Sequence, residues 1–503
     1  MKNKFLKITA FVLLSCTIGC NDDFVEADKT ETAPLFNQEV LTPQQINNEI
    51  NKSVENTGQF HWENTTLQVL WSATQHGSNL VTIGYGTSDD DYVKSNSTKA
   101  EAMVNDILNS IIENEKGSME KTLIYKDEVL NVIDVIVTEQ STLHLLRINK
   151  NIRYVEPADY RYSDFERMND RSGGGGSGCG FESSTLSSVD YTTITPGAKV
   201  PWNFYKHNIP TAWAKSTGAG ITIGVIDTGV SPNQSLLGSN FNNGSSSGRS
   251  VQKFGTFVDS ALAWATTTDG VNDKCGHGTS MTATATAPRN NKGLPVGVAY
   301  SANLISYRAA ENVLLNSYHE QKGVQNAFTG LANNSNVKII SMSMGNVISV
   351  GRIVDGVRYA YGKGKLIFCA GGTSTSFTNF VGVIFPAWMP ETVAVTGIKE
   401  GTGFTKCSNC HSGAEMDFTV VMQRSASGNT APVLSYYENS ADYVGGSSVA
   451  TATTAGIAAL VWSKNPSWTR AQVLAKLKSS ASNYPTRDSK FGYGNINAAL
   501  AVQ

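Results

Sequence analysis

Three polar side chains beside glycine-rich turns are the residues of this sequence best suited to joint chemistry. Asp227 ends the apolar run 223–226, His277 lies between two glycines, and Ser448 begins an Ala-rich segment after Gly445-Gly446-Ser447. A serine hydroxyl becomes a nucleophile when a histidine accepts its proton and an acid holds that histidine in the correct tautomer. The three residues therefore predict a nucleophile, a base and an orienting acid for acyl transfer.

Each of these residues also has an ordinary structural interpretation when it is considered alone. Asp227 could cap a turn, His277 could be a buried structural histidine, and Ser448 could be the N-cap of a helix. The order Asp, His, Ser, with a glycine turn at each position, is what favours a catalytic triad over three unrelated structural residues.

The elements around these residues alternate between short apolar strands and helices. A continuous β-branched run such as 221–226 is typical of a parallel strand that is buried on both faces. The sequence therefore predicts an α/β fold with a doubly wound, mostly parallel sheet, in which Asp227 lies at the carboxyl edge, where ligands of such folds bind. Further strands are expected at 338–341, 366–370 and 392–396, and helices at 280–287 and 469–481.

The first third of the chain predicts a separate small domain over residues 61–165. Its expected order is β-α-β-β-α-β, with elements at 80–85, 99–115, 121–125, 131–137, 141–148 and 152–157. Residues 21–60 are polar and are expected to form a tether. The Gly/Ser-rich run 172–178 indicates a flexible linker over 166–200, before a domain that spans 201–503.

Length and charge restrict the classes of function. The chain has 503 residues, with 40 Lys plus Arg against 42 Asp plus Glu and a formal net charge of −2. This balance argues against a nucleic-acid partner, which would require a surplus of cations to neutralise phosphates. The chain is also long enough to bury a large core without a disulfide scaffold.

The N-terminus predicts export. A basic start is followed by a short apolar stretch at 5–14, which is too short to span a bilayer and is typical of a signal peptide over residues 1–20. Cys20 resembles the lipidated cysteine of a bacterial lipoprotein, Cys16 fits almost as well, and an ordinary signal peptide is the alternative. The protein is expected to be a membrane-anchored lipoprotein in the periplasm or at the cell surface. Processing could release it from the membrane.

Five cysteines remain outside this signal. Cys407 and Cys410 could close a short disulfide in an oxidising compartment, although with His411 they also spell a haem-attachment pattern. Cys179 and Cys275 could form a second bridge, but sequence alone leaves the pairing open.

The three motifs in order resemble those of the subtilisin-like serine proteases. The stretches that carry the resemblance are Ile226-Asp227-Thr228-Gly229, His277-Gly278-Thr279 and Gly446-Ser447-Ser448-Val449-Ala450-Thr451, within a match of roughly 200–503. Residues 152–157 also resemble the end of a subtilisin propeptide inhibitor. The resemblance implies that Ser448 attacks the scissile carbonyl, that His277 transfers the proton, and that Asp227 orients the imidazole.

The resemblance also implies substrate contacts and exposes one departure. Ser343, Met344 and Gly345 correspond to the segment that pairs with an extended substrate, and Gly345 is expected to leave room for a sizeable side chain. The family places an oxyanion-hole asparagine where this chain has Gly372. We therefore expect Thr373 or a backbone N–H to replace that donor, or the enzyme to be slow or inactive.

These observations predict an exported serine endopeptidase that is made as a self-processing zymogen. Its expected partners are a polypeptide substrate, its own propeptide as an intramolecular inhibitor, and a membrane through the lipid anchor. The alternative is a catalytically impaired binding protein on the same scaffold. No cofactor is expected, and Asp259, Asp269 and Asp273 lack the spacing of a dedicated calcium loop.

Overall fold

The computed structural model describes residues 38–94, 97–162, 179–373 and 382–503. The predicted signal peptide with Cys16 and Cys20 lies outside these residues, as does the Gly/Ser-rich run 172–178. Within the described ranges, no helix has the length and apolar character needed to cross a bilayer.

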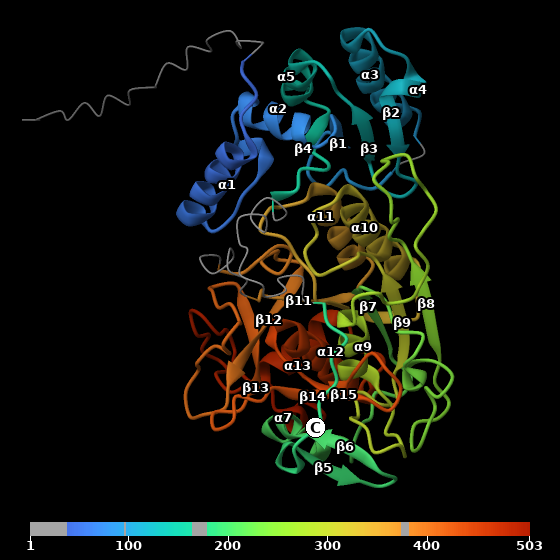
Figure 1. Cartoon of the computed structure of the whole chain (residues 1–503), viewed down its shortest axis with the longest axis vertical. Helices are drawn as coiled ribbons and strands as arrows, with labels where there is room; N and C mark the ends of the chain where they lie inside the picture. Colours follow the sequence, from blue (N-terminus) through green and yellow to red (C-terminus); the bar gives the residue numbers. More distant parts are fainter. Residues whose placement is uncertain (1–37, 95–96, 163–178, 374–381) are drawn as a thin grey trace, which may run out of the picture. The chain divides into compact units, whose positions relative to one another are not determined.

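A seven-stranded parallel sheet forms the centre of the C-terminal region (Figure 1). Its order is β13-β12-β11-β10-β7-β9-β8, and every neighbouring pair of strands is parallel. The strands, in chain order, are β7 (Thr222–Asp227), β8 (Val251–Gly255), β9 (Asn303–Arg308), β10 (Val337–Met342), β11 (Leu366–Ala370), β12 (Thr392–Lys399) and β13 (Met416–Gln423).

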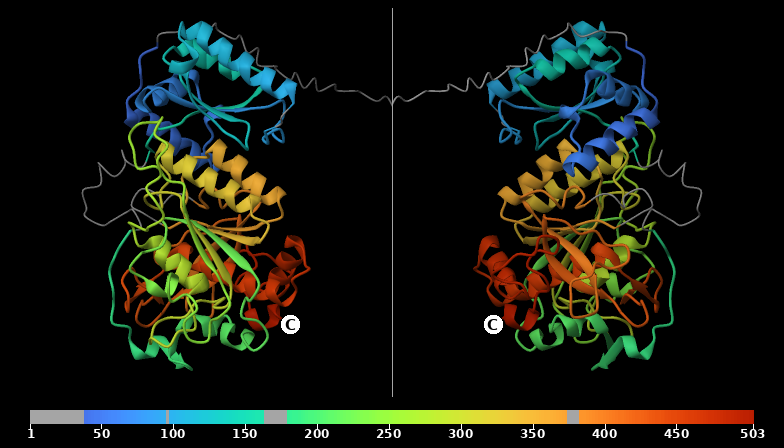
Figure 2. Two further views of the ribbon diagram at one scale, coloured as in Figure 1. Left: turned by 90° about the vertical axis from the view of Figure 1, so that its right-hand side faces the viewer. Right: turned by 90° about the vertical axis from the view of Figure 1, so that its left-hand side faces the viewer.

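Helices cover both faces of this sheet (Figure 2). On one face lie α9 (His277–Thr286) and α12 (Gly446–Lys464), and on the other lie α10 (Tyr318–Asn333) and α11 (Gly351–Gly362). Adjacent residues of β10 pack into the two helix layers. Ile339 belongs to the apolar core around α9 and α12, and Ile340 belongs to the core around α10 and α11. The doubly wound α/β fold expected from the sequence is confirmed.

The N-terminal region contains a second sheet with the predicted order of elements. Its strands pair antiparallel in the order β2-β3-β1-β4, and two long helices, α3 and α5, follow β1 and β3. The bounds are β1 (Leu80–Tyr85), α3 (Thr98–Glu115), α4 (Met119–Thr122), β2 (Leu123–Lys126), β3 (Val132–Ile136), α5 (Gln140–Ile148) and β4 (Ile152–Pro157).

The tether expected over residues 21–60 is wrong for its second half. Helix α1 (Pro43–Thr57) forms there, begun by a capping box between Thr42 and Gln45 with proline in its first turn. Ile46, Ile50 and Val54 follow at helical spacing and are buried in the core of the small domain. Polar composition concealed this pattern, because only one face of the helix is apolar. A 3₁₀ turn at Trp62–Asn64 and helix α2 (Leu67–His76) complete the same core.

The linker expected over residues 166–200 also ends earlier than predicted. A 3₁₀ turn at Ser188–Asp190 leads into a hairpin of β5 (Tyr191–Ile194) and β6 (Ala198–Pro201). The remaining elements are α7 (Trp202–Lys206), α8 (Ile209–Ala212), a 3₁₀ turn at Ser235–Leu237, β14 (Ala431–Leu434), β15 (Ala441–Val444), α13 (Arg470–Ser479) and α14 (Ala498–Ala501).

Buried ion pairs join the small sheet to α11, and a buried hydrogen bond joins it to α10. Asp134 on β3 accepts two hydrogen bonds from the Arg352 guanidinium, at 2.8 and 2.7 Å, and a third from the Tyr318 hydroxyl at 2.8 Å. Arg153 on β4 makes a bidentate pair with Asp355, at 2.8 and 2.7 Å. The side chains of both pairs are almost completely excluded from solvent.

A carboxylate of the small domain also caps α11. Glu156 accepts a hydrogen bond of 2.8 Å from the Gly351 N–H, the first residue of that helix. Burial is the dominant influence on this side chain and raises its pKa to about 8, against the opposing effect of the Gly351 bond. The contact with α10 and α11 therefore includes several buried polar groups that must be satisfied together, beside the apolar packing of Val347 and Ile348 on the small domain.

Removing one partner of the Asp134–Arg352 pair leaves a buried charge without its counter-ion. We expect Asp134→Ala to lower the free energy of unfolding of the full chain by about 3–5 kcal/mol. Urea unfolding of the purified protein measures this change. The control is Glu128→Ala, which breaks the solvent-exposed pair with Lys94 and should cost under about 1 kcal/mol. Equal effects of the two substitutions would contradict the importance of the buried pair.

Candidate active site

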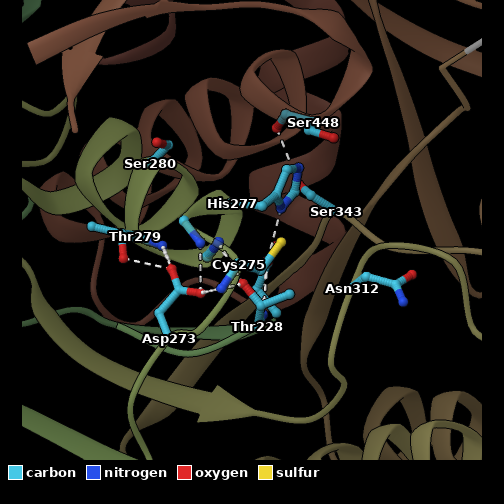
Figure 3. A network of polar contacts seen from close by, with 12 residues as sticks. Thr228, Asp273, Cys275, His277, Thr279, Ser280, Asn312, Ser343 and Ser448 are labelled. Carbon is cyan, nitrogen blue, oxygen red and sulfur yellow. Dashed lines mark hydrogen bonds and ion pairs between the residues drawn. The ribbon is translucent and has the colours of Figure 1, made fainter. Parts of the chain in front are cut away.

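Three different elements bring the predicted triad residues to the carboxyl edge of the large sheet. Asp227 is the last residue of β7, His277 the first of α9, and Ser448 lies in the first turn of α12. His277 Nδ1 lies 2.8 Å from Asp227 Oδ1. Ser448 lies beside the imidazole in Figure 3, and its backbone carbonyl accepts a 3.1 Å hydrogen bond from the Ser343 hydroxyl.

Burial and charge act in opposite directions on His277. Burial lowers the pKa of its imidazole, but attraction to Asp227, the hydrogen bond to that carboxylate and the nearby charge of Asp273 together raise the pKa above its usual value. Asp227 is completely buried, and its Oδ1 also accepts the Thr228 N–H at 2.8 Å. An imidazole held by a buried carboxylate through Nδ1 leaves Nε2 to exchange a proton with a serine.

Asp273 is a structural residue of the site whose role sequence reasoning missed. Its Oδ1 accepts hydrogen bonds from the N–H groups of Cys275 and Gly276 and from the Thr228 hydroxyl, at 2.8, 2.8 and 2.9 Å. Its Oδ2 accepts the Thr279 N–H and hydroxyl, at 2.9 and 2.6 Å (Figure 3). A single carboxylate thus holds the turn before His277, the first turn of α9 and the end of β7. The available signal was an Asp four residues before His277, in the turn that precedes the helix predicted at 280–287.

The segment predicted to bind substrate, 343–345, lies next to the triad, but Gly345 already forms backbone hydrogen bonds within the protein. Ser343 and Met344 are buried, and Gly345 donates its N–H to Val313 O at 3.0 Å and accepts the Leu315 N–H at 3.1 Å. An extended substrate could pair with Gly345 only if these two bonds open.

The packing beside Gly345 requires a residue without a side chain. A Cβ at this position would lie 2.5 Å from Phe385 O and 2.6 Å from Ile384 Cδ1. Glycine is therefore required here by the packing of residues 384–385, and room for a substrate side chain next to this segment stays a prediction.

The two residues predicted for the oxyanion hole lie next to the helix that carries Ser448. The Gly372 N–H donates to Ser447 Oγ at 3.3 Å, and Thr373 Oγ1 lies 3.0 Å from the same oxygen. Ser447 is the residue immediately before Ser448, so the three groups surround the start of α12.

Two disulfides flank the site. Cys407 is joined to Cys410, which engages both sulfur atoms that covalent haem attachment would need. Cys179 is joined to Cys275, two residues before His277. Cys369 is a buried free thiol on β11, and burial raises its pKa far above the usual value, so it remains an unreactive thiol.

The described residues contain no group of three or more His, Cys, Asp or Glu side chains arranged to hold a metal ion. Asp269 is engaged by Lys274 and Arg308, and Asp273 by the hydrogen bonds described above.

A doubly wound α/β sheet whose carboxyl edge holds an Asp–His pair beside a serine is an arrangement of serine hydrolases. The sequence matches the family model described as the subtilase family over residues 218–494. This match covers more than half of the chain, so the protein belongs to the subtilase family. Membership supports a serine-type peptidase.

Curated relatives and one solved structure agree with this assignment. Alkaline elastase YaB of Bacillus sp. strain YaB is 27% identical over 311 residues, covering 62% of this chain and 72% of the relative. Subtilisin E of Bacillus subtilis strain 168 is 28% identical over 308 residues, covering 60% and 71%. Fervidolysin from Fervidobacterium pennivorans, a keratinolytic enzyme related to subtilisin, shares the fold at 16% identity, with a TM-score of 0.58 over 84% of this chain and 61% of that one.

Loss of the Asp273 carboxylate should loosen the turn that carries His277. We expect Asp273→Ala to lower the free energy of unfolding by at least about 2 kcal/mol, because several buried donors lose their acceptor. Thermal unfolding measures this loss. Asp259→Ala is the control, since Asp259 lines an open cleft at 257–261 and should have little effect. An Asp273→Ala protein as stable as the control would contradict this role.

Proposed function

We propose that the protein is an exported serine endopeptidase that hydrolyses peptide bonds through an acyl-enzyme on Ser448. The observation that carries the proposal is the 2.8 Å bond between Asp227 and His277 at the edge where Ser448 lies in the first turn of α12. The subtilase match over 218–494 contains all three residues.

The chemistry follows from the atoms at this edge. Ser448 Oγ forms a bond to the substrate carbonyl carbon while His277 Nε2 takes the hydroxyl proton, and the carbonyl oxygen becomes negative. The peptide C–N bond then breaks as the imidazolium returns that proton to the leaving amine. Water adds to the resulting ester by the same route, which releases the acid and regenerates Ser448. Asp227 stabilises the imidazolium throughout and stays ionised.

We also propose that the protein is made as a zymogen whose N-terminal domain inhibits it. Two ion pairs and the Glu156 cap attach that domain to α11, and the Tyr318 hydroxyl bond to Asp134 attaches it to α10. Arg161 and Cys179, which precede and follow the undescribed residues 163–178, both line one cleft of about 490 Å³. The same cleft is lined by Lys274, which precedes His277 by three residues. This proximity supports cleavage of the connection by the chain's own site.

We further propose that the protein is exported and is anchored to a membrane by a lipid on Cys20. Export and the anchor rest on the sequence pattern of residues 1–20, and the two disulfides are compatible with an oxidising compartment.

Labelling with a fluorophosphonate tests the nucleophile. We expect one covalent adduct on the natural chain and none on Ser448→Ala, measured by intact mass, together with casein hydrolysis by the natural chain only. The mass of the labelled fragment also locates the end of the propeptide.

Maturation provides a separate readout of self-processing. In the absence of other proteases, Ser448→Ala should remain full length, and a variant that matures as fast as the natural chain would refute self-processing. A folded chain, already freed of its N-terminal domain, that forms no adduct would instead favour the catalytically impaired binding protein that Gly372 suggests.

The pH profile should report the state of His277. The base must be neutral to accept a proton, and its pKa is raised above the usual value of 6.5 by Asp227. We therefore expect kcat/KM to fall on the acid side with a midpoint above 6.5. Hydrolysis of a peptide substrate whose ionisation is constant over the range measures this limb, and a midpoint below 6.5 would contradict the assigned pair.

A further inference from the structure

A segment of the chain itself already lies along Gly345. The Gly345 N–H donates to Val313 O at 3.0 Å, and the Gly345 carbonyl accepts the Leu315 N–H at 3.1 Å, so that Leu314 and Gly345 form a parallel bridge. An extended substrate that adds a strand beside a protein segment uses the same backbone groups. Residues 313–315, which we call the strap, therefore take both of the groups that such a substrate would need at Gly345.

Three further contacts fasten the strap. Asn312 Oδ1 accepts the Leu314 N–H at 2.8 Å, and Asn346 Nδ2 donates to Leu315 O at 2.8 Å. The Leu315 side chain is completely buried in the apolar core around α10 and α11. The strap is therefore a defined element of the fold, and its displacement costs hydrogen bonds and buried apolar surface.

The N-terminal domain holds the chain just beyond both sides of this bridge. On the side of the strap, Asp159 Oδ1 accepts the Tyr318 N–H at 2.9 Å. On the other side, Val347 and Ile348, which follow Gly345 closely, belong to the apolar core of the N-terminal domain. The two segments that pair at Gly345 are thus both fixed by the same domain.

We propose that the strap is an autoinhibitory element, and that the N-terminal domain keeps it closed by holding both flanks. The proposal rests on the proposed function, since it adds a second block to the zymogen described there. While the domain is attached, an extended peptide cannot reach the backbone groups of Gly345. Removal of the domain frees Tyr318 and residues 347–348, so the bonds at Gly345 open more readily and a substrate can take the place of the strap.

Hydrogen exchange of the full-length Ser448→Ala chain tests the strap without any need for catalysis. Exchange at the Leu315 and Gly345 amides requires their mutual bonds to open. We expect Asp159→Ala in this background to speed exchange at these two amides by roughly tenfold, because a hydrogen bond to a charged acceptor is lost at the flank. Asp159→Asn keeps an acceptor oxygen and should exchange more slowly than Asp159→Ala.

Two references make the exchange result decisive. The amides of β7 report global opening of the same protein. Glu128→Ala removes an exposed ion pair of the N-terminal domain and should leave the strap unchanged. No increase at Leu315 and Gly345 in Asp159→Ala, an increase no larger than that in β7, or an equal increase in Glu128→Ala would each overturn the proposal.

Peptides of two lengths test the consequence for substrates in the natural chain after maturation. Asn346→Ala removes the side-chain bond to Leu315, so it should lower KM by roughly fivefold for a peptide with four residues before the scissile bond. KM for a substrate with one such residue should be unchanged, because that substrate is too short to lie along residues 343–345. Equal changes for the two substrates, or no change, would overturn the proposal. If the natural chain shows no Ser448-dependent hydrolysis, the proposed function fails, and the exchange experiment still decides whether the domain holds the strap.

Discussion

The carboxyl edge of the parallel sheet is the constraint on which the site depends. Asp227 ends β7 with its carboxylate excluded from solvent, and the Nδ1 of His277 at the start of α9 meets that carboxylate at 2.8 Å. A buried carboxylate requires close partners, because ionisation without them is strongly unfavourable. The orientation of the imidazole is therefore tied to the burial of β7, and the position of α9 is tied to the same strand through the contacts of Asp273 with Thr228 and Thr279.

The second half of the site is organised by α12. This helix begins at a glycine turn, and its buried length is made of small and apolar residues that pack across the large sheet. Ser447 and Ser448 lie in its first turn, where free N–H groups and the positive end of the helix dipole favour a developing negative charge. Gly372 and Thr373 meet this turn from a separate segment, and His411 packs against Gly372. At Gly372, where the family has an asparagine, this chain thus differs in two ways. It lacks the side-chain amide donor, and the packing around the start of α12 is changed.

The N-terminal domain contacts the molecule on α10 and α11, on the sheet face opposite α9 and α12. Its interface combines buried ion pairs with a capped helix start, so separation returns charged groups to water on both surfaces. Such an interface fixes how the two surfaces align, because each charged group needs its own partner. It differs from the packing of α12, which is made of small and apolar residues. Stability and release of this domain can therefore change without altering the core beneath the triad.

The sequence alone determined the fold class and the triad candidates. The β-branched runs and the β-α-β-β-α-β order are local patterns, and each glycine turn marks its polar residue, so Asp227, His277 and Ser448 could be named without coordinates. Tertiary structure decided what depends on distant packing. Helix α1 was missed because its apolar face is narrow and its composition polar; the space beside Gly345 is filled by residues 384–385; and the pairing of Cys179 with Cys275 joins segments 96 residues apart. The close approach of His411 to Gly372, where a Cβ would lie 2.4 Å from His411 Nδ1, is likewise invisible in one dimension, because residues 372 and 411 meet only when their segments pair.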